Sequence, residues 1–108
     1  MVERIYSFLG LATKAGKLLS GEETCERALK SGKVYLVIVS EDASDNTKKR
    51  FRDRCSYRTV EIRYFGEKEL LGRFTGKKVR SVIAIADKGF AEHLKEMIDN
   101  RGIEHGGV

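Results

Sequence analysis

The sequence contains no proline and only two cysteines and two histidines among its 108 residues. Cys25 and Cys55 form no Cys-x-x-Cys pair and have no histidine near them in the sequence, which argues against a zinc site and against a redox pair. Isolated cysteines are typical of a reducing compartment, where each serves as a small apolar core residue. Without proline, glycine is the residue that marks turns and helix ends in this chain.

Long hydrophobic runs are also missing. No apolar run approaches the ~20 residues that a helix needs to cross a bilayer. The first residues, Met1–Ile5, lack the basic-then-apolar layout of a signal peptide. We therefore expect a cytoplasmic protein that does not interact with a membrane.

Charge of one sign is in modest excess. The chain has 21 lysines and arginines against 16 aspartates and glutamates, a net charge of +5. This balance favours polyanionic partners without deciding the matter. A chain of this length forms one domain with two or three packed layers. We place that domain at residues 1–101 and expect residues 102–108 to be a frayed tail.

Helical and strand patterns alternate along the chain without a linker or an internal repeat. Apolar residues recur at helical spacing in 3–15, in a segment between Gly21 and Gly32, in 45–56, in 67–75 and in a last helix that begins near Phe90. The strand-like segments are 18–20, 34–39, 59–64 and 82–86, of which 34–39 and 82–86 are apolar enough to be covered on both faces. The alternation predicts an α/β fold, a three-layer α-β-α sandwich with a central mixed sheet of about four strands.

The junction at Ser20–Gly21 has two interpretations. The first turn of the helix that follows leaves backbone N–H groups unpaired beside a glycine, which suits a phosphate or the edge of a nucleic acid. The same residues are also consistent with a purely structural role, through a capping box formed by Ser20 and Glu23 and two i, i+4 ion pairs, Glu23/Arg27 and Glu26/Lys30.

Catalysis has little support in the sequence. No nucleophile–base arrangement and no metalloprotease or P-loop spacing is present. His93 and His105 are expected at the surface. Asp87 follows a buried strand, where it could bind a ribose or a metal, although a helix N-cap explains it without any function. We expect a non-enzymatic protein with no catalytic residue, metal, cofactor or small-molecule substrate.

Three groups of basic residues are candidates for phosphate contact. Lys14 and Lys17 flank Gly16, close to the helix start at Ser20–Gly21, and Lys77–Arg80 form a basic loop. In a sandwich of this kind the helix start and the loop can meet at one end of the sheet, combining N–H donors with positive charge. The third group, the basic run 48–58, is better explained as the solvated face of a helix.

Five short segments, spread over nearly the whole chain, carry a resemblance to a known family: Leu9–Lys17, Ser20–Glu23, Ala28–Lys33, Glu41–Thr47 and Gly89–Ala91. In these segments the chain resembles the kink-turn RNA-binding ribosomal protein superfamily (the L seven-Ae / L thirty-e type), and in particular its bacterial YlxQ-like branch. The resemblance implies an α-β-α sandwich that recognises a sharply bent RNA with tandem sheared G·A pairs.

The family's recognition motif, Gly-x-Asn-Glu-x-x-Lys, falls on Gly21, Glu23, Thr24 and Arg27. Glu23 places a carboxylate where the family has a neutral amide or, in some members, a lysine. Thr24 keeps a hydroxyl without the carboxylate, and Arg27 keeps the positive charge. The family's second contact, a loop that packs on an extruded base, falls on Lys77–Ser81.

These observations predict a monomeric, ribosome-associated protein that binds structured RNA, a kink-turn or a similar bend. The residues expected to contact RNA are Lys14, Lys17, Ser20, Gly21, Glu22, Glu23, Thr24, Arg27, Lys77, Lys78, Val79 and Arg80. The alternative is a protein-interaction or regulatory module on the same fold with weakened RNA binding. Three acidic residues at the motif favour that alternative: Glu22, Glu23 and Glu26.

Overall fold

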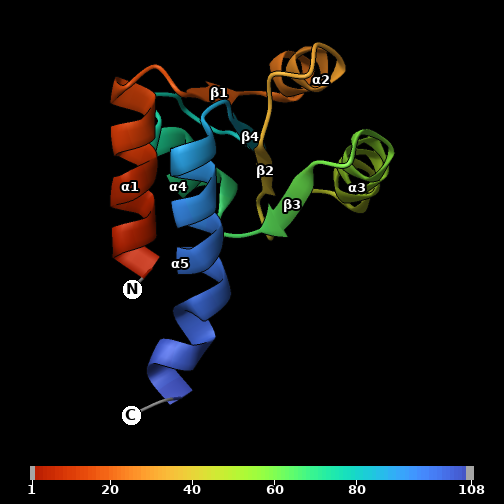
Figure 1. Cartoon of the computed structure of the whole chain (residues 1–108). Coiled ribbons are helices and arrows are strands. Elements are labelled where there is room, and N and C mark those ends of the chain that lie inside the picture. The colour runs from red at the N-terminus through yellow and green to blue at the C-terminus, as the bar shows by residue number, and fades with distance from the viewer. Residues whose placement is uncertain (1, 107–108) are drawn as a thin grey trace.

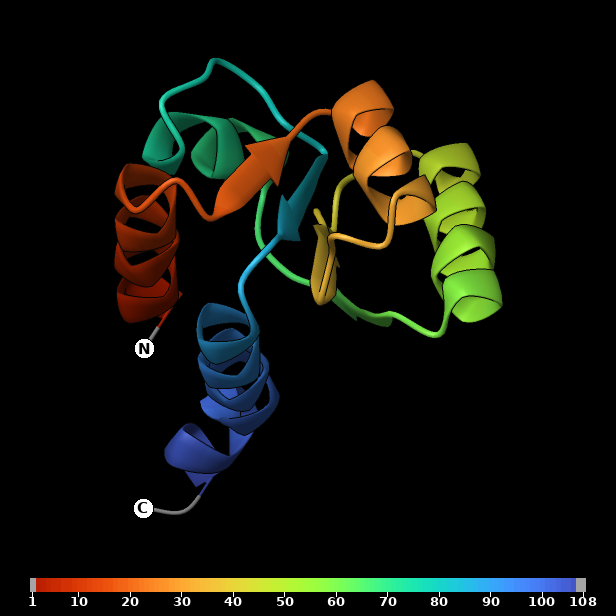
Figure 2. The same ribbon diagram turned by 45° about the horizontal axis from the view of Figure 1, so that its top comes forward.

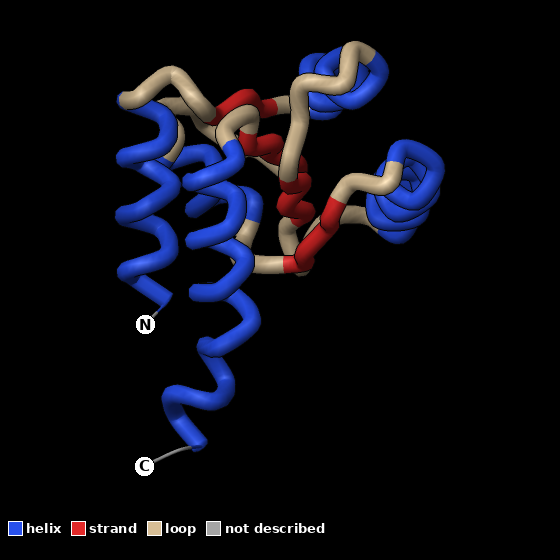
Figure 3. Tube along the Cα trace, in the orientation of Figure 1, coloured by secondary structure: helices blue, strands red, loops and turns tan. Residues whose placement is uncertain are grey.

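A computed structural model describes the backbone of residues 2–106 and the side chains of residues 2–101. Helices and strands alternate in the order predicted from the sequence (Figure 1). The helices are α1 (Val2–Lys14), α2 (Glu22–Lys30), α3 (Asp45–Arg58), α4 (Lys68–Phe74) and α5 (Lys88–Gly106). The strands are β1 (Leu18–Ser20), β2 (Leu36–Val39), β3 (Glu61–Tyr64) and β4 (Val82–Ile85). Figure 3 shows the strands as a central layer between helices.

The four strands form one mixed sheet in the order β1-β4-β2-β3. Strand β4 is antiparallel to both of its neighbours, β1 and β2, while β2 and β3 are parallel. The two segments predicted to be covered on both faces are the central strands β2 and β4, and all of their residues are buried. Their apolar, mostly β-branched composition therefore reflects their position in the middle of the sheet.

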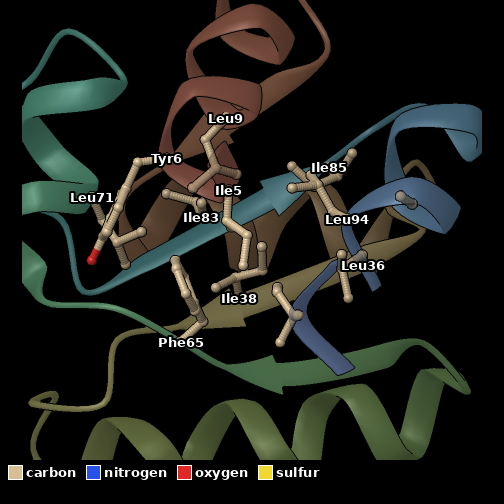
Figure 4. Packing of buried hydrophobic residues seen from close by; sticks show 12 residues of the cluster. Ile5, Tyr6, Leu9, Leu36, Ile38, Phe65, Leu71, Ile83, Ile85 and Leu94 are labelled. Atoms are coloured by element: carbon tan, nitrogen blue, oxygen red, sulfur yellow. The ribbon is translucent and has the colours of Figure 1, made fainter. Parts of the chain in front are cut away.

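The two faces of the sheet are covered by different helices, which confirms the predicted α-β-α sandwich. Alternate residues of the central strands point to opposite faces. Leu36, Ile38, Ile83 and Ile85 pack with residues of α1, α4 and α5 (Figure 4). Val37, Val39, Val82 and Ala84 pack with residues of α2 and α3 on the other face. Figure 2 shows α2 and α3 side by side, apart from α1 and α4.

Side-chain caps begin two of the helices. Ser44 is the N-cap of α3, where its Oγ accepts a hydrogen bond of 3.1 Å from the Thr47 N–H. Asp87 precedes α5, and its carboxylate accepts a hydrogen bond of 2.9 Å from the Phe90 N–H. Of the two interpretations of Asp87, the helix cap is the one that this geometry supports.

The last helix is longer than the sequence indicates. Helix α5 continues through Gly106 and so enters the segment 102–108, for which we expected a frayed tail; residues 107 and 108 lie outside the described residues. His93 on this helix is exposed, as expected, and its ring centroid lies 4.6 Å from that of Phe8. The side chain of His105 lies outside the described side chains.

Candidate nucleic-acid interface

The candidate site begins where β1 passes into α2. Gly21 has φ 99° and ψ 147°, a left-handed conformation that favours glycine, and its N–H donates a 2.9 Å hydrogen bond to the Val82 carbonyl. Gly21 is also the N-cap of α2, which has no side-chain cap. The predicted capping box is therefore wrong: Ser20 is the last residue of β1, and its hydroxyl contacts a different partner. The first N–H groups of α2 stay available to a ligand.

The basic loop lies against this helix start. Arg80 Nε donates a hydrogen bond of 3.2 Å to Ser20 Oγ, and Arg80 Nη1 donates one of 2.7 Å to the Val79 carbonyl. The loop is also tied to α4, because the Arg80 N–H donates to the Lys68 carbonyl and the Lys77 N–H to the Gly72 carbonyl. The predicted meeting of helix start and loop at one end of the sheet is confirmed. Figure 2 shows the loop between α4 and β4 arching past the end of β1.

Helix start and loop together enclose an open groove of about 630 Å³. Val79 is exposed at its rim and offers an apolar contact, whereas most of the lining is polar. The lining residues are Ser20, Gly21, Glu22, Glu23, Thr24, Glu26, Arg50, Val79, Arg80 and Ser81. The groove therefore holds N–H donors, an arginine from the loop and one apolar side chain within reach of a single ligand.

Two carboxylates of α2 are matched by arginines of α3. Glu22 forms an ion pair with Arg50 and accepts a 3.4 Å hydrogen bond from the Thr47 hydroxyl. Glu26 pairs with Arg54 at 2.8 Å, and also with Arg50 at 3.9 Å. The sequence-based prediction paired Glu26 with Lys30 and treated 48–58 as a solvated face. It missed the arginines because it did not place α3 beside α2. The two glutamates are four residues apart, and so are the two arginines, so the pairs match when the helices lie side by side.

Glu23 and Arg27 lie on the outer face of α2. The predicted ion pair between them is present, with an N–O distance of 3.7 Å. The side chains are 95% and 71% exposed, so the pair contributes little to stability and both groups can turn to a ligand.

All four predicted lysines, and also Arg27, lie outside the residues that line the groove. Lys17 is at the far end of β1, where its carbonyl accepts a 2.8 Å hydrogen bond from the Ala86 N–H, while Gly21 meets Val82 at the near end. Because β1 separates Lys14 and Lys17 from Gly21, the structure does not join them to the helix start. Lys77 and Lys78 lie on the loop and are exposed, outside the groove lining.

Both cysteines are buried in the core beneath α2 and α3, as predicted. Burial raises the pKa of Cys25 to about 12 and that of Cys55 to about 11. The thiolates that would act as nucleophiles or metal ligands are therefore disfavoured.

Residues 3–95 match the family described as "Ribosomal protein L7Ae/L30e/S12e/Gadd45 family". The match spans most of the chain, and the protein belongs to this family. Within the described residues no helix is long and apolar enough to cross a membrane.

Two similar proteins carry the name "RNA-binding protein YlxQ". The one from Bacillus subtilis is 38% identical, covering 87% of this chain and 94% of the relative, and the one from Enterococcus faecium is 40% identical, covering 90% and 93%. A structure of a Bacillus halodurans protein of unknown function superposes with a TM-score of 0.85 at 42% identity, covering 88% of this chain and 96% of the other. The Giardia lamblia 15.5kD RNA binding protein has the same fold, with a TM-score of 0.74 at 18% identity and coverage of 92% and 86%.

Proposed function

We propose that this protein binds structured RNA, a kink-turn or a similarly bent element, through the groove between the start of α2 and the loop 76–81. It acts in association with the ribosome in the cytoplasm, as a monomer and without catalysis. The observation that carries the proposal is the meeting of the uncapped N–H groups of the first turn of α2, directly after Gly21, with the loop residues Val79 and Arg80. The names of the two YlxQ relatives support RNA as the ligand.

The groove residues and Arg27, which lies beside them on α2, divide into three roles. Gly21 allows the RNA backbone to approach the helix start, because it carries no side chain there. Glu23 and Thr24 face the base edges, where a carboxylate or hydroxyl can accept from a guanine N–H or an adenine amino group. Arg27 and Arg80 neutralise phosphates, and Val79 packs against an extruded base.

The acidic residues at the motif are compatible with a polyanionic ligand. Arg50 pairs with Glu22, and Arg54 with Glu26, so both negative charges are compensated within the protein. Glu23 keeps a largely exposed charge, which suits a base edge and disfavours a phosphate. Lys14, Lys17, Lys77 and Lys78 would serve as outlying phosphate contacts for an RNA that extends beyond the groove.

A titration of labelled kink-turn RNA at two salt concentrations tests the proposal. The control RNA has its tandem G·A pairs replaced by Watson–Crick pairs. We expect sub-micromolar binding to the kink-turn and a large loss with the control, because the groove recognises a bent shape. Weak binding that is equal for both RNAs and falls steeply with salt would contradict the proposal and leave only a generic basic surface.

A second candidate is a protein-interaction module on the same fold. The observation that favours it is Glu23, which is 95% exposed at the position where the family motif has an amide or a lysine. If the kink-turn RNA does not bind at either salt concentration, this second function becomes the better one.

A further inference from the structure

Tyr57 on α3 is an aromatic residue that the proposed site does not use. The residue is 83% exposed, more than any other large hydrophobic residue among residues 2–101. It lies off the buried stripe of α3, which consists of Thr47, Phe51 and Cys55. The Arg58 guanidinium carbon lies 5.5 Å from the centroid of the Tyr57 ring, a cation–π contact that helps to hold the ring in place.

A regular ladder of contacts links α2 and α3 from the groove to Tyr57. Glu22 contacts Arg50, Glu26 contacts Arg54, and the Lys30 carbonyl accepts a 3.4 Å hydrogen bond from Arg58. Each pair has the same separation of 28 residues, so the two helices run in parallel and in register. Figures 1 and 2 both show α2 and α3 side by side.

The furrow between these helices adjoins the candidate groove, because Glu26 lines both. Glu26 lines the groove at one end and also a hollow of about 270 Å³ further along, which Leu29 and Tyr57 border. Arg50 and Tyr57 are seven residues apart on α3, a rise of about 10 Å. At the ~3.4 Å spacing of a stacked strand, three or four nucleotides cover that distance.

The charges along the furrow suit a nucleic-acid strand better than a protein surface. Arg50 compensates the charge of Glu22, and Arg54 compensates that of Glu26. Lys30 and Arg58 add positive charge at the end of the furrow where Tyr57 lies. Asp53, which also lines the hollow, pairs with Arg52 at 3.8 Å. The exposed Tyr57 ring, flanked by Lys30 and Arg58, suits one stacked base whose phosphates the two cations can reach.

We propose that the furrow between α2 and α3 is a second contact surface, which takes a single-stranded stretch of RNA leaving the groove. One base of that stretch stacks on Tyr57, and Lys30 and Arg58 contact its phosphates. This inference rests on the proposed RNA-binding function and extends it from a bent element to the strand that adjoins it.

The test compares three labelled RNAs by fluorescence anisotropy: a flush-ended kink-turn, and the same RNA with an oligoadenosine extension of about six nucleotides on the 3′ end or on the 5′ end. We expect the wild-type protein to bind one of the extended RNAs about tenfold more tightly than the flush-ended RNA. If neither extension improves binding while the flush-ended RNA still binds, the furrow is not an RNA surface and the proposed function stands. Absence of binding to the flush-ended RNA overturns both the proposed function and this inference.

Three variants assign the gain to the aromatic ring. Tyr57→Ala should abolish the tenfold gain and keep the affinity for flush-ended RNA. Tyr57→Phe should retain the gain, because stacking needs the ring and not the hydroxyl. Tyr35→Ala removes a 50% exposed tyrosine outside the furrow and should leave the gain intact. The inference is overturned if Tyr57→Ala keeps the gain. It is also overturned if this variant unfolds at the wild-type temperature but binds the flush-ended RNA and the extended RNA more weakly by the same factor.

Discussion

At the scale of single residues, Glu22 and Glu23 are neighbours in the sequence with different surroundings. Glu22 is 40% exposed and bound to Arg50, while Glu23 is 95% exposed and has only the loose pair with Arg27. Adjacent positions of a helix point about 100° apart, so one faces α3 and the other faces solvent. A count of acidic residues at the motif therefore overstates the negative charge that a ligand meets.

Arg27→Ala is expected to weaken binding of kink-turn RNA by about tenfold and to reduce the salt slope by about one. The reason is that the exposed guanidinium is available to a phosphate, while its loose pair with Glu23 contributes little to the fold. The measurement is an anisotropy titration over a series of salt concentrations. Lys48→Ala, which removes a charge from α3 and leaves α2 and the groove lining intact, should change little. Equal losses from both variants would argue against the groove as the binding surface.

The two cysteines are expected to resist thiol reagents in the folded protein. Because burial raises the pKa of Cys25 to about 12 and of Cys55 to about 11, both thiols stay protonated and inaccessible at pH 8. Labelling with a chromogenic disulfide reagent should be slow in buffer and complete within mixing in denaturant. Rapid labelling of the native protein would show that the core beneath α2 and α3 opens easily.

At the scale of elements, the close packing of α4 against the loop determines where Val79 and Arg80 lie. A Cβ on Gly72 would lie 2.6 Å from the carbonyl carbon of Lys78 and 2.8 Å from the Val79 nitrogen, too close for either backbone atom to stay in place. The loop approaches the groove in this conformation because α4 has a glycine at that position.

Gly72→Ala is expected to destabilise the protein by about 1–3 kcal/mol, and to weaken RNA binding several-fold, because the loop must move. Thermal unfolding and an RNA titration measure the two effects. The matched control is Gly10→Ala on α1, where a Cβ would meet the Phe74 carbonyl oxygen at an ordinary 3.4 Å. That variant should be neutral or stabilising by up to about 1 kcal/mol, because alanine favours a helix interior. If the two variants have the same thermal stability and the same RNA affinity, the loop accommodates the Cβ at position 72 without loss of either.

The sequence predicts elements better than it predicts contacts between them. Helical and strand periodicity is local, and it is sufficient for the element order and the buried central strands. The meeting of loop and helix start follows from the predicted sandwich. The ion pairs of Glu22 and Glu26 with Arg50 and Arg54 were missed because they depend on which helices are neighbours. The capping box failed for a related reason: pairing with β4 keeps Ser20 in the sheet, so the helix begins one residue after Gly21.

The grouping of Lys14 and Lys17 with Gly21 shows the same limit. These residues are close in sequence, but the three residues of β1 separate them by about 10 Å of extended chain. Short sequence distance indicates proximity within a helix or a turn and fails across a strand. Their place in an RNA complex stays a prediction.

At the scale of the whole molecule, the sheet separates two unequal halves. Helices α1, α4 and α5 cover one face, where Tyr6 and Phe65 are buried, while α2 and α3 cover the other face, where Phe51 is the largest buried side chain. The groove lies at the end of the sheet where α2, the 76–81 loop and α3 converge. Contributions from both halves therefore meet at the proposed site, because the loop is tied to α4 and the arginines come from α3.

The edge strand β3 is linked to α5 by an ion pair that should make stability depend on pH. Arg63 Nε donates a hydrogen bond of 2.8 Å to Asp99 Oδ1, and Nη2 one of 3.1 Å to Oδ2. Hydrogen bonding from Arg63 lowers the pKa of Asp99 below its ordinary value. A carboxyl whose pKa is lower in the folded state stabilises that state above its unfolded pKa. The stabilisation is lost as pH falls through the folded value.

Asp99→Asn is therefore expected to reduce the free energy of unfolding at pH 7 by less than about 1 kcal/mol, since the Asp99 side chain is 48% exposed and solvent screens the pair. The difference from wild type should begin to shrink as pH falls through about 4, the ordinary pKa of an aspartate, and disappear only below the lowered folded pKa of Asp99. Denaturant unfolding at a series of pH values measures it. Asp53→Asn removes a carboxylate that lies 3.8 Å from its neighbour Arg52 on the same helix. This variant should lower the free energy of unfolding at pH 7 by less than Asp99→Asn does. A difference for Asp99→Asn that persists unchanged at pH 2 would mean that the residue acts through packing of α5 and not through its charge.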